Sequence, residues 1–245
     1  DDEDNNLHLS TTEALTLKVD SVNPAMNIQK IYLDAYQQET NSSGDPVYPQ
    51  VNTEITEAIN QGVLMMVYTG HGGAEQLAFE SVMTAADLGN LDNEFHYPVI
   101  LNASGEVNRY DDPAVFSLGA QMLFADNKGF AGVLSPSRVG YALANFNFSK
   151  KAIGLLVAND NKRMGDILRE VKSASGEIST VKKFTYFGDP SMKPAFPHNF
   201  VETETINGVQ AELFADTLNP GEEIVITGNI TDENGNIMTG FSGQL

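Results

Sequence analysis

The chain has 245 residues, no cysteine, and 33 acidic against 14 basic side chains, a formal net charge of −19. The length suits one domain of about 200 residues and a shorter second piece. Such acidity argues against a nucleic-acid partner, because phosphate requires a basic face. The absence of cysteine excludes disulfides, thiolate metal sites and a thiol nucleophile in the chain as written. The longest apolar run, 63–68, has six residues, whereas a bilayer span needs about 20, so no membrane span is expected.

Helix and strand signals alternate over the first two hundred residues. Ser10 and Glu13 have the spacing of a capping box and predict a helix that carries apolar residues over 15–19 and ends before Pro24. The further predicted elements are a strand over 28–33, a surface loop over 41–49, a helix over 51–60 ended by Gly62, strands over 63–68 and 97–102, a helix begun at Asp112 and Pro113, a strand over 129–134, a helix from about 141, and a helix through 164–171.

This alternation predicts an α/β fold, a mostly parallel sheet with helices on both sides. Ligands of such sheets bind beyond the carboxyl ends of the strands, which makes the loops there the candidate functional segments. The pattern changes after Pro197: Asn-Gly pairs at 207–208 and 234–235 indicate hairpins of a β domain. We expect two domains, 1–197 and 198–245, with a strand missing before the first and the second incomplete.

The first candidate loop is 68–73, where His71 lies among glycines directly after a buried strand. A histidine there can approach a substrate closely, and neighbouring amides can face an oxyanion. A tight turn with an incidental histidine is the alternative. The second loop, 102–106, follows the next strand, and Ser104 is its hydroxyl. A nucleophile in that loop faces His71 if the two strands are neighbours, but Ser104 taken alone is better interpreted as a polar turn residue.

Several motifs together resemble the gingipain-type C25 cysteine peptidases. Tyr-Thr-Gly-His-Gly-Gly (68–73) carries the resemblance, together with 102–113 and 184–192, and 1–6 and 30–39 support it. Within this family the chain most resembles the cell-surface sortases of the type IX secretion system, the PorU type. The resemblance implies a caspase-like fold over the first domain and an immunoglobulin-like domain after it.

The resemblance also implies an activity, partners and a location. Such sortases cleave the C-terminal signal from exported cargo proteins and transfer the cargo to an amine of surface lipopolysaccharide or to water. The implied partners are signal-bearing cargo, lipopolysaccharide and other surface components of the system. The implied location is the cell surface, at the outer membrane.

Site roles follow from the resemblance residue by residue. His71 matches the catalytic general acid/base, and the amides of Gly72 and Gly105 match the oxyanion hole. Glu3 matches an acidic residue that orients the histidine, with Asp2 second, although an acidic surface loop is the alternative. The nucleophile of the family aligns with position 105, where this sequence has Gly105.

A glycine cannot attack a carbonyl, so the chain as written is expected to be inactive or nearly so. Three explanations stay open: a natural pseudo-peptidase, an engineered inactive form, and a shift of the nucleophile to Ser104. A non-catalytic module that binds cargo signals is therefore the rival to the sortase. Glu106 and Arg109 are assigned to substrate binding, with an ion pair between Arg109 and Asp111 or Asp112 as the alternative.

No metal or cofactor is expected. The histidines at 8, 71, 96 and 198 lack zinc-site spacing. Asp232–Asn236 has a superficial likeness to a calcium loop, but a hairpin turn accounts for it more simply. The acidic residues Asp1, Asp2 and Asp4 are a second, weak calcium candidate.

Overall fold

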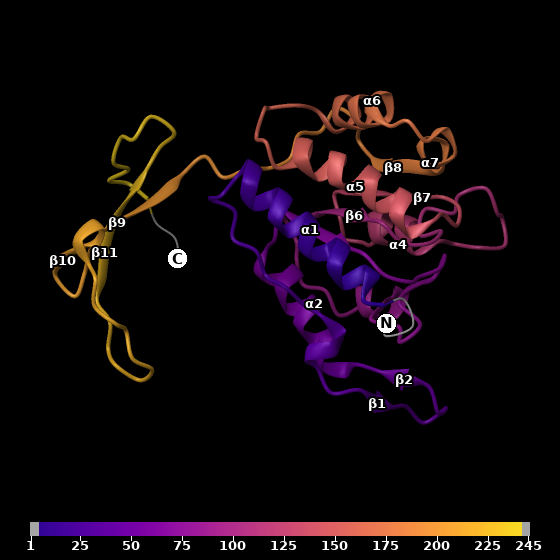
Figure 1. Ribbon diagram of the computed structural model, residues 1–245, viewed down its shortest axis with the longest axis horizontal. Helices are drawn as coiled ribbons and strands as arrows, with labels where there is room; N and C mark the ends of the chain where they lie inside the picture. The colour runs from indigo at the N-terminus through magenta and orange to yellow at the C-terminus, as the bar shows by residue number, and fades with distance from the viewer. Residues whose placement is uncertain (1–4, 242–245) are drawn as a thin grey trace. The chain divides into compact units, whose positions relative to one another are not determined.

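The computed structural model describes residues 5–241 and divides the chain into a unit that ends at Pro194 and a unit that begins at Ala195 (Figure 1). The first unit is built on a four-stranded sheet in the order β3-β6-β7-β8. Its strands are β3 (Met65–Tyr68), β6 (Val99–Asn102), β7 (Gly132–Pro136) and β8 (Phe184–Gly188). The first three are parallel and β8 is antiparallel to β7, which confirms the predicted mostly parallel sheet.

Helices cover both faces of this sheet. The helices on one face are α1 (Leu7–Val22), α5 (Ala142–Leu156) and α6 (Met164–Ala174); those on the other are α2 (Pro49–Gln61), α3 (Ala85–Leu88) and α4 (Leu118–Phe124). Side chains alternate along β6, so Val99 and Leu101 pack with the helices α1, α5 and α6, while Ile100 packs with α2, α3 and α4. Two hydrophobic cores therefore hold the sheet between two helical layers.

Shorter elements complete the first unit. They are the hairpin β1 (Glu39–Thr40) with β2 (Pro46–Val47), the pair β4 (Gln76–Leu77) and β5 (Met83–Thr84), the 3₁₀ turn η2 (Leu33–Ala35), and α7 (Ile178–Lys183), which leads into β8. The β4–β5 pair extends the first candidate loop through a bridge between Gly72 and Leu77.

Three sequence predictions are wrong in detail. Helix α1 begins at Leu7, so Ser10 lies inside the helix, where its hydroxyl donates to the Leu7 carbonyl instead of capping (2.9 Å). Asp112 caps no helix; its carboxylate accepts the Ala114 amide (3.0 Å) in a turn, and the helix starts only at Leu118. Residues 28–33 form no strand, because no described strand pairs with them.

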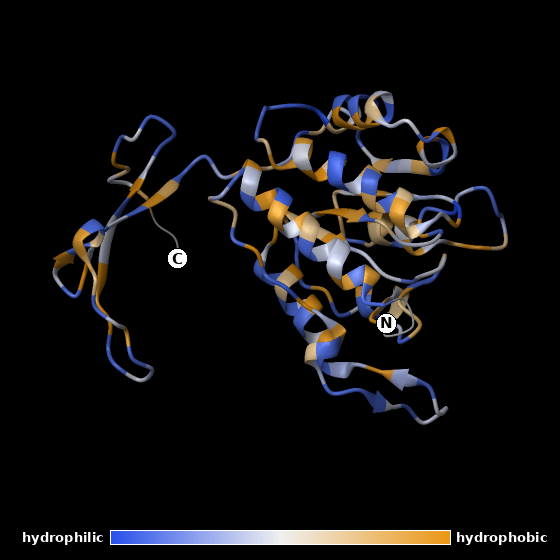
Figure 2. Ribbon diagram, in the orientation of Figure 1, coloured by the Kyte–Doolittle hydropathy of each residue, from blue (hydrophilic) through white to orange (hydrophobic). Residues whose placement is uncertain are grey.

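The second unit is a small antiparallel sheet in the order β10-β9-β11. Its strands are β9 (Phe200–Ile206), β10 (Val209–Gln210) and β11 (Ile226–Thr231), with the 3₁₀ turn η3 (Ala211–Leu213) beside them. The predicted turn at Asn207 and Gly208 is confirmed by their positive φ angles of 51° and 79°. Figure 2 colours parts of this sheet as hydrophobic, and Val201 and Ile226 are exposed. An immunoglobulin-like sandwich needs a second sheet, so that assignment stays a prediction.

Within residues 5–241, none of the helices has the length and the apolar character that crossing a membrane requires.

Candidate active site

The two candidate loops lie against each other at the carboxyl edge of the sheet. Strands β3 and β6 pair in register up to Tyr68 and Asn102, and the Ala103 amide donates to the Tyr68 carbonyl (2.9 Å). Beyond that point the backbones meet at two glycines. A Cβ atom added to Gly105 would lie 2.1 Å from the Gly72 carbonyl oxygen, and one added to Gly72 would lie 2.4 Å from the Ser104 hydroxyl oxygen. Both positions therefore need glycine for close approach.

His71 is held by its backbone and presents its ring at the surface. The Tyr68 hydroxyl donates to the His71 carbonyl oxygen (2.6 Å), and the Ala78 amide donates to the same oxygen (2.9 Å). The imidazole stacks on the Phe79 ring at a centroid distance of 5.3 Å and meets the His8 ring edge-on at 5.1 Å. Burial raises the pKa of the Tyr68 phenol, so that group remains a hydrogen-bond donor at neutral pH.

Sequence analysis missed His8 and Phe79 as neighbours of His71. His8 lies in the first turn of α1, and the Thr69 hydroxyl donates to its carbonyl (3.3 Å) and also bonds the Thr12 hydroxyl. The predicted helix start at Ser10 left His8 outside the helix, so its place beside the sheet edge went unseen. Phe79 follows β4 and has a 73% exposed side chain, for which hydrophobic periodicity gives no signal.

Buried amide side chains anchor the second loop. The Asn102 side chain donates to the Ser104 carbonyl (3.1 Å) and the Ser135 hydroxyl (2.8 Å), and accepts from the Ser104 amide (3.2 Å). The Asn145 side chain on α5 donates to the Ala103 carbonyl (2.9 Å). The Asn108 side chain donates to backbone carbonyls of β7 and β8 at 3.0 and 3.1 Å. Buried side-chain amides therefore fix the course of this loop.

Ser104 is placed under Gly72 and does not contact His71 through a hydrogen bond. Its side chain is 2% exposed, and its hydroxyl finds no hydrogen-bond partner in the described part of the chain. By contrast, the backbone amides of Gly72 and Gly105 donate to no acceptor within residues 5–241, so both are available to an incoming oxygen. The geometry favours the amides over the serine as reactive-site groups.

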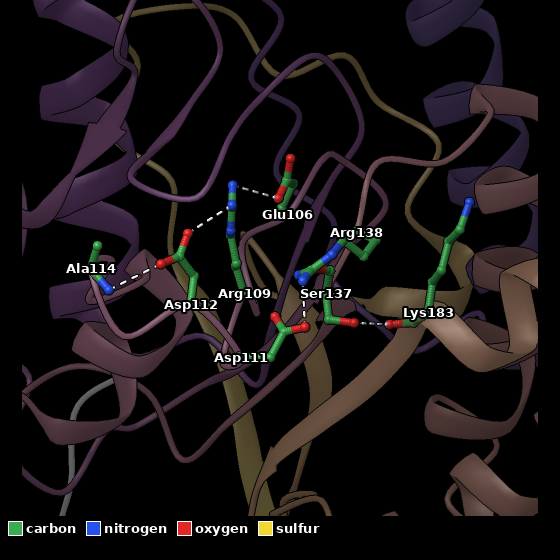
Figure 3. Close-up of polar contacts among 8 residues, drawn as sticks. All are labelled: Glu106, Arg109, Asp111, Asp112, Ala114, Ser137, Arg138 and Lys183. Atoms are coloured by element: carbon green, nitrogen blue, oxygen red, sulfur yellow. Dashed lines mark hydrogen bonds and ion pairs between the residues drawn. The ribbon is translucent and has the colours of Figure 1, made fainter.

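Ion pairs fix the polar residues that follow in the second loop (Figure 3). The Arg109 guanidinium bonds Glu106 at 3.0 Å and Asp112 at 2.8 Å. Arg138, which follows β7, pairs with Asp111, and this hydrogen bond lowers the pKa of the Asp111 carboxyl. The alternative of an ion pair between Arg109 and Asp112 is confirmed. Glu106 and Arg109 are therefore committed to each other in the absence of substrate.

Glu3, Asp2 and the acidic residues beside them lie outside the described residues, so the predicted orienting group has no structural account. Over residues 5–241, no three His, Asp or Glu side chains come together in a group that could hold a metal ion. Asp232 accepts the amides of Asn234 and Asn236 (2.9 Å each) within its own turn.

The family model of peptidase family C25 matches residues 1–195, most of the chain. The chain belongs to peptidase family C25. Among solved structures it is similar to the complex of Porphyromonas gingivalis RgpB pro- and mature domains, with 18% identity and a TM-score of 0.51, over 62% of this chain and 40% of that one. It is also similar to the Arg-specific cysteine proteinase gingipain R (RgpB), with 18% identity and a TM-score of 0.52, over 62% and 39% of the two chains.

These similarities establish the gingipain-like fold of this C25 chain. The chain spans about two fifths of the length of each solved relative, 40% and 39%. No curated protein matches the chain. At 18% identity the two structures share a fold with this chain, and their substrates are not carried over to it.

Proposed function

We propose that this C25 chain recognises the C-terminal signals of exported cargo proteins, as the type IX sortases do, and that in its present form it holds them without covalent catalysis. The sequence resemblance supports the kind of cargo and the location at the cell surface. The rival, a sortase that turns over in this form, requires a nucleophile at or beside position 105.

One observation supports the proposal that the chain binds cargo without covalent catalysis. Gly105 has no side chain, and a Cβ atom there would lie 2.1 Å from the Gly72 carbonyl oxygen, which belongs to the backbone of the histidine loop. A side chain at position 105 therefore requires the backbone of the histidine loop to shift. Ser104, the nearest hydroxyl in the sequence, is buried and lacks a hydrogen bond to the candidate base His71.

The remaining groups still suit a peptide carbonyl. The free amides of Gly72 and Gly105 provide two donors for its oxygen, and the exposed His71 ring can bond the neighbouring peptide group. If a thiol stood at 105, its sulfur would attack the carbonyl carbon, the C–N bond would break, and His71 would give its proton to the leaving amine. An amine acceptor or water would then release the cargo from the thioester.

The test compares cleavage and binding of a signal-bearing cargo protein by the unaltered chain, Gly105→Cys and Gly105→Ala. We expect the unaltered chain to bind cargo without cleaving it. Gly105→Ala is the matched control, because it introduces the same Cβ contact with Gly72 without a thiol. If Gly105→Cys cleaves and Gly105→Ala does not, the site is competent and the thiol alone is missing.

Three further results would overturn parts of the proposal. Cleavage by the unaltered chain that disappears in Ser104→Ala would overturn the proposal and assign the nucleophile to Ser104. Absence of cargo binding in all forms, with folded protein verified by circular dichroism, would reject cargo recognition. Cleavage by Gly105→Cys that survives His71→Ala would reject the role of His71.

A further inference from the structure

Positive charge is concentrated in one stretch of this acidic chain. The helices α5, α6 and α7 lie within residues 142–183, which hold eight of the 14 basic side chains and four of the 33 acidic ones. This stretch has a formal charge of +4 in a chain whose net charge is −19. Charges of one sign repel one another, so their concentration on one side of a molecule favours a partner of opposite charge.

The lysines of α5 and α7 are not neutralised by carboxylates. At α6, Lys162 pairs with Glu170 (3.0 Å) and Arg169 with Asp166 (3.4 Å). Within residues 5–241, by contrast, no ion pair includes any of the four lysines of the other two helices, which are Lys150, Lys151, Lys182 and Lys183. Their positive charge is therefore available to a partner.

These lysines lie on helices that contact each other. Helix α7 packs against α5 (Figure 1). The Lys183 ammonium donates to the Val139 carbonyl, shortly before α5 begins (2.9 Å). The Lys183 carbonyl accepts the amide and the hydroxyl of Ser137 at 2.8 and 3.0 Å. The end of α7 is thus fixed beside the start of α5, at the loop that follows β7.

Exposed apolar side chains accompany the lysines. On α5, Leu143 lies seven residues before Lys150 and therefore on the same helix face, and it is 60% exposed. On α7, Ile178 lies four residues before Lys182 and is 70% exposed. The other side of α5 is buried, with Phe148 in the core. We call this surface the lysine face, which consists of Leu143, Lys150, Lys151, Ile178, Lys182 and Lys183.

We propose that the lysine face docks on a bilayer that carries anionic phospholipid headgroups. Its ammonium groups bind the lipid phosphates, and Leu143 and Ile178 enter the boundary between headgroups and acyl chains. Charge complementarity selects this occupant, because an anionic surface repels the rest of so acidic a chain and attracts this side of it. The apolar side chains favour a bilayer over a free anion, which offers them no contact.

Docking in this way requires no cargo and goes beyond the proposed recognition of cargo signals. It also orients the candidate site. Lys183 bonds the loop that follows β7, and β7 ends at the same edge of the sheet as β3 and β6. A bilayer on the lysine face therefore lies near the edge at which the histidine and the two glycines meet.

The test measures co-sedimentation of the whole chain with vesicles. One set contains equal parts of phosphatidylglycerol and phosphatidylcholine, and the other contains phosphatidylcholine alone. We expect binding to the anionic vesicles only, and weaker binding as salt is added. Lys150→Gln combined with Lys182→Gln should weaken this binding by at least about tenfold, because each lysine near an anionic surface adds to the affinity.

The matched control is Lys30→Gln combined with Lys128→Gln, which removes the same charge outside the lysine face. It should change the binding by less than about twofold. Lys150 and Lys182 suit the test because they donate no hydrogen bond within the described residues, unlike Lys151, which donates to the Ala174 carbonyl (2.7 Å). Circular dichroism verifies that both double variants are folded.

A fluorescent reporter tests the apolar part of the contact. The chain has no tryptophan, so Ile178→Trp adds a single one to the lysine face. Its emission should shift to the blue with anionic vesicles and stay unchanged with inorganic phosphate. Phe95→Trp is the control, because Phe95 is 84% exposed outside the lysine face, and its emission should not respond.

Four results would overturn the proposal. Two of them are equal binding to both kinds of vesicle and equal losses in the two double variants. A blue shift of the Ile178→Trp reporter with inorganic phosphate alone would assign the lysine face to a free anion. A blue shift with polyglutamate and none with anionic vesicles would assign it to an acidic protein.

Discussion

The histidine loop, 68–73, and the serine loop, 102–112, meet at the same edge of one sheet but are held in opposite ways. The histidine loop is fixed by the Tyr68 and Thr69 hydroxyls, and its His71 ring is exposed. The serine loop is fixed by side-chain amides, and Asn102 and Asn108 are completely buried. One loop presents a reactive group at the surface, and the other buries its anchoring amides in the core.

This difference explains how the site keeps its shape without a nucleophile. A buried side-chain amide that donates to backbone carbonyls favours one backbone path, because another path would break those hydrogen bonds. The path of the serine loop therefore depends on Asn102, Asn108 and Asn145, and not on the side chain at position 105. Such a loop can therefore still bind a peptide when the catalytic nucleophile is absent.

The largest expected effect comes from breaking the anchor of the serine loop. Asn102→Ala removes two donated bonds and one accepted bond and leaves a small cavity in a fully buried position. We expect the free energy of unfolding to fall by about 3 kcal/mol, measured by urea denaturation. Asn147→Ala, an exposed amide on α5, is the control and should cost less than about 0.5 kcal/mol. Equal effects of the two variants would show that Asn102 anchors nothing.

The contact between the loops should be the next largest. Gly72→Ala places a Cβ atom against the Ser104 hydroxyl and should cost about 2 kcal/mol by overpacking. Ser104→Ala should be close to neutral, because its buried hydroxyl bonds no described residue. The double variant should recover roughly 1 kcal/mol of the Gly72→Ala cost. Strictly additive free energies would mean that the two residues do not touch.

Loosening the histidine loop should cost less. Tyr68→Phe removes the donor to the His71 carbonyl and should lower the free energy of unfolding by about 1 kcal/mol at neutral pH. Because burial raises the Tyr68 pKa, the folded state keeps a proton that the unfolded state releases above about pH 10. The wild type therefore loses stability as the pH rises beyond that value, and the difference between wild type and variant should shrink. A difference that grows with pH would contradict the burial of this phenol.

Sequence patterning predicts the layers of the first unit well and its connections poorly. The apolar periodicity over 164–171 correctly predicts α6, in which Met164, Ile167 and Val171 are buried. Residues at this spacing lie on one face of a helix, and that face packs on the core. The capping box at Ser10 fails because tertiary contacts of the first turn with Thr69 extend α1 back to Leu7. Asp112 and Pro113 suit a helix start locally, but the ion pair of Asp112 with Arg109 and its turn hold the chain away from one.

The sequence likewise predicts some features of the candidate site and not others. Position along the chain places His71, Gly72 and Gly105 at the ends of neighbouring strands, and the structure brings their loops together. The partners of His71 come from α1 and from beyond β4, at sequence distances that no motif spans. The close approach of the Gly105 and Gly72 backbones depends on how the two loops pack. Composition and motif spacing do not predict that packing.

The smallest effect should come from the ion pair at the outer end of the serine loop. Arg138→Gln removes the hydrogen bond that lowers the pKa of the Asp111 carboxyl, so that pKa should rise toward its ordinary value in a carboxyl NMR titration. A carboxyl with a lowered folded-state pKa contributes stability that is present at neutral pH and is lost as the pH falls through that pKa. Both side chains are more than two fifths exposed, at 42% and 46%, so solvent screens the pair and salt should abolish its effect. Lys162→Gln, which breaks a comparable exposed pair with Glu170 away from the loops, is the control.

If Arg138→Gln weakens cargo binding while Lys162→Gln leaves it unchanged, the outer end of the serine loop contributes to recognition as well as to the fold. If both leave binding unchanged, the ion pair at the outer end of the serine loop contributes to the fold and not to recognition.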